Sequence, residues 1–229
     1  KIQVPHPTFC WLCRAQRRLA FRNERALYPR TSSMSGQKLF STYPEDAPFP
    51  VYTQMEWHGD GWDPLSYGRD YDFSKSFFDQ FRELWRVVPR PAKSIIIIHD
   101  SDYSNNASEL RNCYLVFNTT GAQDCAYGNA ISYCRNSFEN SHCRKLELSY
   151  QNFWLYNCAR AVYSVQCAES TDIYFSRNLR GCNNCFGSVG LRGKSYCLFN
   201  EQLSKEEYQN KVAEYDLGSY LGLQKALAD

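Results

Sequence analysis

The sequence predicts a mainly β fold, a parallel β-solenoid in which the backbone winds through stacked coils. The first observation behind this prediction is a period of twelve residues, which is typical of repeat architectures. The second is a column of small residues at that period, and the third is a column rich in Asn and Asp directly before it. The small-residue column contains Cys113, Cys125, Ser137, Ser149, Ala161, Ile173, Cys185 and Cys197. The Asn/Asp column contains Asn112, Asp124, Asn136, Leu148, Arg160, Asp172, Asn184 and Tyr196.

The period also predicts the size of a coil. Twelve residues fit one strand and one corner, so two blocks make a plausible coil of 24 residues, and residues 95–200 make about four coils. Cysteines separated by 24 residues would then stack at roughly 4.8 Å in inward columns, where small side chains are required. The predicted core thiols are Cys134, Cys158 and Cys182 in one column, and Cys143 and Cys167 in another. Asn and Asp suit the tight corners between strands.

Four regions are expected along the chain. They are a degenerate zinc-ribbon-like and aromatic connecting region at 1–73, a helix and linker at 74–94, the solenoid at 95–200 and a helical cap at 201–229. A solenoid has open ends with unpaired strand edges, so we expect the two helical regions to cover them.

Local signals place the elements inside these regions. Ser74 is the expected N-cap of a helix with a strongly aromatic face, and Pro89 ends that helix. The apolar run Ile95–Ile98 is the expected entering strand. The capping box Ser204–Glu207 begins the C-terminal helix, and residues 221–227 are expected to add a last short one.

Composition limits the classes of function. The formal net charge is only +2, so charge alone predicts neither nucleic-acid nor membrane binding. No apolar run is long enough to predict a membrane span. The eleven cysteines are odd in number and nine of them fall in the repeat, which favours reduced, buried thiols over a disulfide scaffold. We therefore expect a cytoplasmic protein, or a virion component assembled in the cytoplasm.

The pair Cys10 and Cys13 is a candidate metal site. Two thiolates at this spacing can turn onto one zinc ion, but a closed structural site needs four ligands. The remaining candidates are His6, His58 and Glu56, so the site is expected to be incomplete. We expect no resident cofactor, with zinc at Cys10 and Cys13 as the alternative.

A basic run follows this pair. Arg14, Arg18, Arg22 and Arg25 would share one face of a helix, which suits an anionic partner such as nucleic acid. A solvated helix face explains the same spacing, and the sequence leaves both explanations open.

Several longer motifs point to a known family. These motifs are the runs 17–28, 43–52, 62–73, 184–187, 196–200 and 203–208. Together they resemble an uncharacterised family of cysteine-rich proteins from candidate-phyla bacteria and their viruses. The resemblance implies an N-terminal zinc ribbon followed by a cysteine-rich repeat region, and it implies no activity. The family's ribbon carries further cysteines near Ser32, Thr53 and Glu56, where this chain has none.

Two main classes of function remain, with a third beside them. A carbohydrate-active β-helix, acting as a lyase, hydrolase or glycan binder, would use outward carboxylates, of which Asp124 and Asp172 would lie two coils or roughly 9.6 Å apart. His99 and His142 have no partner that would complete a nucleophilic triad. We therefore favour a non-catalytic structural or interaction protein with protein partners, such as a component of a virion or another assembly. Nucleic-acid binding through the basic N-terminal region is the third class.

Overall fold

The computed structural model describes residues 3, 6–216, 218–219, 221–222 and 224. The chain forms two compact units, residues 1–94 and residues 95–229. Each unit has its own sheet structure and is described by itself below.

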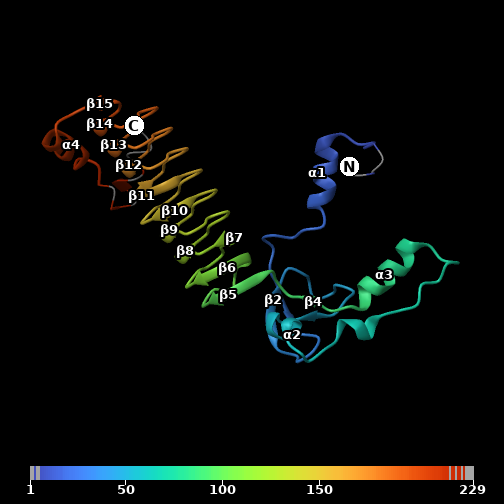
Figure 1. The fold of residues 1–229 in the computed structure, drawn as a ribbon. Helices are drawn as coiled ribbons and strands as arrows, with labels where there is room; N and C mark the ends of the chain where they lie inside the picture. The colour runs from blue at the N-terminus through green and yellow to red at the C-terminus, as the bar shows by residue number, and fades with distance from the viewer. Residues whose placement is uncertain (1–2, 4–5, 217, 220, 223, 225–229) are drawn as a thin grey trace. The chain divides into compact units, whose positions relative to one another are not determined.

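The first unit combines short helices with two small two-stranded sheets (Figure 1). Strands β1 (Tyr28–Thr31) and β2 (Lys38–Ser41) form an antiparallel hairpin, and β3 (Val51–Tyr52) pairs in parallel with β4 (Arg90–Pro91). Its helical elements are α1 (Trp11–Leu19), α2 (Gln54–His58), the 3₁₀ helix η1 (Pro64–Tyr67) and α3 (Phe77–Val87).

Hydrogen bonds join the two small sheets of this unit. The backbone N–H of Ser33, just after β1, donates to the carbonyl of Val51, which is fully buried in β3. The hydroxyl of Ser41 in β2 donates to the carbonyl of Ala92 at 3.0 Å. The β1–β2 hairpin is therefore held to the β3–β4 pair at both places.

The aromatic helix begins two residues later than expected. The N-cap of α3 is Ser76, whose hydroxyl accepts from the N–H of Asp79. Ser74 instead donates from both its N–H and its hydroxyl to Oδ1 of Asp72, which places it in the turn before the helix. The prediction of Ser74 as the N-cap was wrong because a competing Asx turn uses that residue.

The second unit is a β-solenoid of stacked parallel coils, as the sequence predicts (Figure 1). Its strands are β5 (Ile95–His99), β6 (Asn105–Arg111), β7 (Phe117–Thr120), β8 (Gln123–Ala126), β9 (Arg135–Phe138), β10 (Arg144–Glu147), β11 (Tyr156–Val162), β12 (Thr171–Tyr174), β13 (Asn183–Phe186), β14 (Ser195–Leu198) and the antiparallel β15 (Glu201–Gln202).

The size of the coil corrects the sequence-based expectation. Residues pair with the residue twelve positions later, as in Ile173 with Cys185 and Cys185 with Cys197. Each coil therefore contains twelve residues rather than 24, and the solenoid has about nine turns rather than four. The blocks seen in the sequence are the coils themselves.

Backbone conformation explains how twelve residues close a coil. Nearly every third residue from Ile97 to Asn200 has a positive φ, including Asn136 (46°), Glu139 (53°), His142 (55°) and Lys145 (56°) in one coil. Each left-handed residue turns the chain, so a coil has four corners joined by very short extended segments. The 24-residue prediction failed because it assumed strands in which alternate residues face the core, whereas here every third residue does.

The residue after most corners points inward and is buried, with exceptions near the ends such as Lys194. Cys134, Leu146, Cys158, Ser170 and Cys182 form one such column, and every one of them is buried. The two predicted columns are therefore inward, but Cys134 and Cys158 lie two coils apart, separated by Leu146. All nine repeat cysteines are buried and free.

A ladder of buried polar side chains runs along another inward column. The N–H of each inward residue donates to the side chain one coil earlier, as Ser164 N does to Asn152 Oδ1 (2.8 Å) and Ser176 N to Ser164 Oγ (3.3 Å). Asn140 and Ser188 continue this ladder in the two directions. Ser and Asn therefore occupy inward positions for their acceptor atoms as well as for their size.

Helix α4 (Lys205–Val212) packs on the last coils. Its capping box is the predicted one, with Ser204 and Glu207 bonded reciprocally. Tyr208 is buried and its ring lies edge-on to that of Tyr196, at 5.8 Å between centroids. The helix expected at 221–227 falls largely outside the described residues.

Candidate functional site

The candidate catalytic carboxylates do not meet. With coils of twelve residues, Asp124 and Asp172 are four coils apart, which is about 19 Å at the spacing of paired strands. Glycoside hydrolysis needs two carboxyl groups within roughly 10 Å. The predicted pair was wrong because its separation was computed from a coil of twice the true size.

These carboxylates instead bond to the neighbouring coils. Asp124 accepts from Nδ2 of Asn112 at 2.7 Å, and this bond is the main cause that lowers the pKa of Asp124. Arg160 donates to both carboxylate oxygens of Asp172 at 2.5 and 2.7 Å. Glu139 likewise accepts from Gln151 one coil later. The outer polar columns are thus ladders that join successive coils.

The two histidines of the repeat are equally unsuited to a triad. The ring of His142 packs edge-on against Phe153, at 5.5 Å between centroids. The carbonyl of His99 accepts from the hydroxyl of Ser101 and from the N–H of Asn112. Among the contacts described for these rings, none joins them to a nucleophile.

Cys10 and Cys13 lie at the start of α1. Cys10 is the N-cap, and its sulfur accepts from the N–H of Cys13 at 3.4 Å. That hydrogen bond is the main cause that lowers the pKa of Cys10, a fully exposed thiol. His58 bonds to Gln54. Within the described part of the chain, no three His, Cys, Asp or Glu side chains gather in a way that could hold a metal ion.

The positions where the resemblance implies missing cysteines form a hydrogen-bonded cluster. Ser32 donates its hydroxyl to Oε2 of Glu56 at 2.6 Å, and the N–H of Thr53 donates to the same oxygen at 2.8 Å. Burial alone would raise the pKa of Glu56, but hydrogen bonds from Ser32, Ser35 and Thr53 outweigh it and lower the pKa to about 2. A carboxylate therefore holds the two loops at the place where a ribbon would hold a metal.

The arginine stripe is shorter than expected. Helix α1 ends at Leu19, so Arg14 and Arg18 share its basic face while Arg22 and Arg25 lie beyond it. Arg22 pairs with Glu24 at 2.9 Å. The helix contains no acidic residue and buries none of its residues. The prediction placed all four arginines on one face because it assumed a helix that continues through Arg25.

The solenoid carries aromatic side chains in two adjacent columns of its outer surface, one with Tyr114 and the other with Tyr103 and Tyr127. Tyr103 packs against Tyr114, and Tyr114 against Tyr127, with ring centroids 5.2 and 5.7 Å apart and rings tilted by 62° and 89°. Farther along, Tyr163 and Phe175 stack at 5.3 Å. Because these rings pack on one another along the stack of coils, part of the surface of each ring is covered by its neighbour.

A hollow of about 460 Å³ lies beside these rings in the first coils. One outer column supplies Asp100 and Asp124, the next supplies Asp102, Tyr114 and Phe138, and the buried Cys113 and Cys125 also line the hollow. No lysine or arginine lines it among the described residues. The lining aromatic residues are Tyr103, Tyr114 and Phe138.

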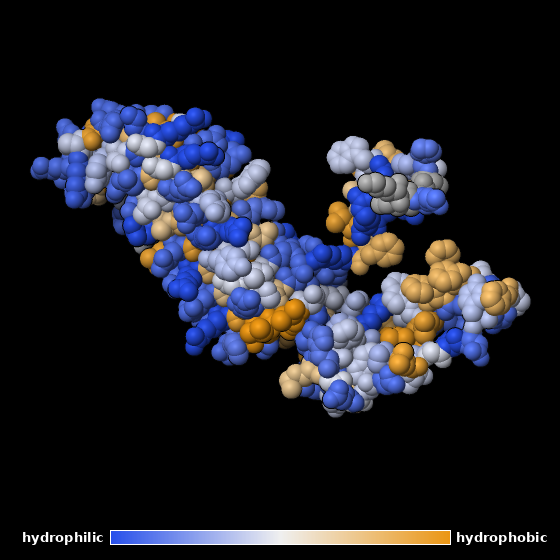
Figure 2. Space-filling model, in the orientation of Figure 1, coloured by the Kyte–Doolittle hydropathy of each residue, from blue (hydrophilic) through white to orange (hydrophobic). Residues whose placement is uncertain are grey.

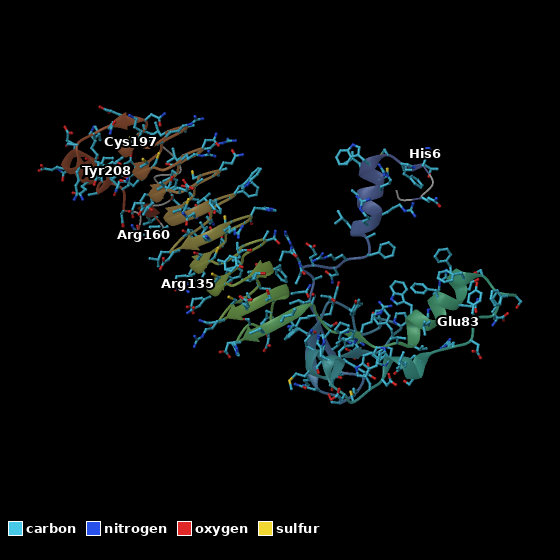
Figure 3. All side chains as sticks on the ribbon, in the orientation of Figure 1. His6, Glu83, Arg135, Arg160, Cys197 and Tyr208 are labelled. Carbon is cyan, nitrogen blue, oxygen red and sulfur yellow. The ribbon has the colours of Figure 1, made fainter. Side chains whose placement is uncertain are left out.

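The same two outer columns are covered at the other end of the solenoid. Tyr208 lies beside Asp172 and Tyr174, which extend the columns of Asp124 and Tyr114, and Figure 3 shows Tyr208 beside the last coils. Burial, with these neighbours and Cys185 adding to it, raises the pKa of Tyr208. The ring of Tyr215 packs on Phe186 at 4.7 Å. The hollow is therefore the uncovered equivalent of a surface that α4 covers.

Two further apolar groups are exposed (Figure 2). On α3, Phe77, Phe81 and Trp85 stack in succession, with ring centroids 5.9 and 6.3 Å apart, and remain about half exposed. In the first coil, Ile96 and Ile97 are 64% and 65% exposed. Sequence reasoning assigned the face of α3 to a core or cap and did not identify the isoleucine pair as exposed.

None of the described helices is both long and apolar enough to cross a membrane. Comparison with known proteins found no family model and no curated protein that matches this chain.

Proposed function

We propose that this chain is a non-catalytic structural or interaction protein, in which the solenoid is a rigid spacer and exposed surfaces bind protein partners in an assembly. The resemblance of its motifs suggests a virion, or another assembly formed in the cytoplasm, as the specific setting.

The observation that carries this proposal is the use made of the outer polar side chains. Asp124 and Asp172, the candidate catalytic groups, each accept from a side chain of an adjacent coil, and Glu139 does the same. A general acid or nucleophile needs a partner carboxylate and room for substrate, whereas a ladder needs a bond to the next coil. The arrangement supports a stiffening role.

The interior supports the same role. Inward Ser and Asn side chains accept N–H groups from the next coil, and apolar residues such as Ile131, Leu155 and Leu179 fill the other side of the core. Each coil is thus bonded to its neighbours both inside and outside. A stack of coils bonded in this way is stiff, so it keeps the groups along its length at fixed distances from one another.

Nucleic-acid binding is a second candidate function, favoured by α1. Its three arginines, Arg14, Arg17 and Arg18, are accompanied by no acidic residue within the helix, and phosphate groups are natural partners of such a surface. A glycan-binding role has less support, because sugar rings stack on open aromatic faces and the rings here pack partly on one another, edge-on for Tyr114 with Tyr127 and stacked for Tyr163 with Phe175.

One set of assays on the purified chain tests the proposal. Incubation with polysaccharides should release no new reducing ends and no unsaturated products, and sedimentation should report a defined association state. Cleavage that is lost in either Asp124→Asn or Asp172→Asn would overturn the proposal in favour of a carbohydrate-active enzyme. Loss in one variant is sufficient, because the two carboxylates lie too far apart to act together.

We also propose that the N-terminal ribbon needs no metal, because Glu56 joins Ser32 to Thr53 where a zinc ion would join cysteines. Elemental analysis of protein purified without chelators should find less than one equivalent of zinc. One equivalent that disappears in Cys10→Ser would contradict this.

A further inference from the structure

The hollow in the first coils has two parallel stripes of different chemistry. Asp100 and Asp124 belong to one outer column and lie two coils apart, roughly 9.6 Å. Tyr114 and Phe138 belong to the other column, also two coils apart, and are 44% and 45% exposed. Any occupant must therefore offer positive charge along one side and apolar groups along the other.

Helices already occupy this kind of surface in the protein. At the far end of the same two columns, α4 lies on the last coils with Tyr208 buried and Tyr215 against Phe186. The residues directly before Tyr208 are Glu206 and Glu207, so α4 is a precedent for the aromatic contact only. The three carboxylates of the hollow favour an occupant that adds basic side chains to such an aromatic contact.

Helix α1 has the matching stripes. At 100° per residue, Trp11, Ala15 and Leu19 form an apolar stripe, and Arg14 and Arg18 form a basic stripe beside it. Trp11 is 68% and Leu19 67% exposed. The nine residues of α1 extend over about 13.5 Å, which is close to the roughly 14 Å spanned by the coils that line the hollow.

From this match we infer that α1 of one molecule docks in the hollow of a second molecule, with Arg14 and Arg18 facing Asp100 and Asp124 and with Trp11 and Leu19 against Tyr114 and Phe138. The two surfaces of the contact differ, so the contact is head-to-tail and each added molecule presents a new free hollow. Chains or rings of molecules follow. The inference rests on the proposed role in an assembly and names the surfaces that build it.

The area of one short helix is small, so the contact should be weak and reversible, with a dissociation constant on the order of micromolar. Sedimentation velocity of the full chain should show an average mass that rises with protein concentration across that range. Because the contact pairs exposed charges, the rise should be smaller at high salt.

Charge reversal identifies the surfaces. Arg14→Glu with Arg18→Glu, and separately Asp100→Lys with Asp124→Lys, should each weaken association by about tenfold or more. An equimolar mixture of the two double variants should associate again, because each supplies the charge that the other lacks. The matched control, Arg180→Glu with Arg192→Glu on a different outer column, should leave association unchanged. Restoration in the mixture also shows that both double variants are folded.

Three results would overturn the inference. They are a wild-type mass that stays constant with concentration, association that neither double variant weakens, and a mixture that fails to associate although each variant melts cooperatively. Retention of duplex DNA at moderate salt that is lost in the Arg14/Arg18 variant, with association intact, would assign α1 to nucleic acid instead. If association survives both reversals, the proposed structural role stands and only this interface is refuted.

Discussion

Asn152 donates from its side-chain Nδ2 to Oδ1 of Asn140 at 2.9 Å, inside the solenoid and one coil away. Its own N–H donates to the same oxygen at 3.0 Å, and its Oδ1 accepts from the N–H of Ser164 in the next coil. Each of these amides is almost fully buried. The side chain of Asn152 thus bonds a side chain of the preceding coil and a backbone group of the following one, which makes the core dependent on polar side chains as well as on apolar ones.

Replacing this amide should be costly. In Asn152→Leu, the N–H of Ser164 loses its partner inside the core, while the carbonyl of Ala161 keeps the N–H of Tyr150. Leaving this buried donor unpaired predicts a loss of about 1 to 3 kcal/mol in the free energy of unfolding, measured by urea titration. The control Asn183→Leu replaces an exposed side chain and should change stability by less than about 0.5 kcal/mol. Equal effects would show that the ladder contributes nothing specific.

Ser149→Leu tests the small-residue column. Ser149 is buried, and its hydroxyl accepts from the N–H of Ala161 at 3.3 Å. Leucine would both overfill a coil of fixed pitch and remove that acceptor, so we expect destabilisation of about 1 to 3 kcal/mol or more. Ser141→Leu, at a partly exposed outward position, is the matched control. A melting temperature unchanged by the first substitution would contradict the inward assignment.

The thiols should react in a defined order. Cys10 and Cys13 are exposed, and the pKa of the buried Cys113, which lines the hollow, is lowered chiefly by its hydrogen bond with Cys125. Burial instead raises the pKa of Cys143 to about 12 and that of Cys158 to about 11. Alkylation of the native chain near neutral pH should modify Cys10 and Cys13 first and Cys113 next.

Mass spectrometry after limited alkylation gives that order directly. Unfolding without reductant should then expose the remaining cysteines as free thiols, so that nearly all nine repeat cysteines are modified. Recovery of most of them as disulfides would refute the reduced core.

The cluster around Glu56 predicts a pH dependence of the first unit. The pKa of Glu56 is lowered from its ordinary value of 4.5 to about 2 in the folded protein. A lowered pKa contributes stability that is fully present above about 4.5 and is lost as the pH falls towards 2. Fluorescence of Trp57 and Trp62 during thermal unfolding should report this loss. In Glu56→Gln the same pH range should produce a smaller change, and an identical profile would show that the carboxylate is not the responsible group.

The period of twelve was visible in the sequence because every coil repeats the same inward and corner positions. The size of the coil was not visible in the sequence. The corners follow one another too closely for each one to contain a residue that favours turns. Leu148, Arg160 and Tyr196 adopt positive φ angles that their side chains do not favour. Stacking against neighbouring coils imposes these angles, and a local propensity cannot reveal that.

The candidate sites also differ in whether the sequence could predict them. The capping box at Ser204 is local in sequence and was predicted, whereas the cluster of Ser32, Thr53 and Glu56 depends on two loops meeting. The hollow was also hidden, because Asp100, Asp124 and Tyr114 become neighbours only once the coil length is known.

The left-handed corners have a consequence for how the solenoid forms. A non-glycine residue in this conformation costs roughly 1 kcal/mol, and the coil that contains Asn136, Glu139, His142 and Lys145 has four of them. A single coil in isolation should therefore be unstable. A new coil should become ordered only when it pairs with the exposed edge of a coil that has already formed. Opening should proceed from the ends inward, so amide hydrogens should exchange fastest in the terminal coils and slowest near Asn152.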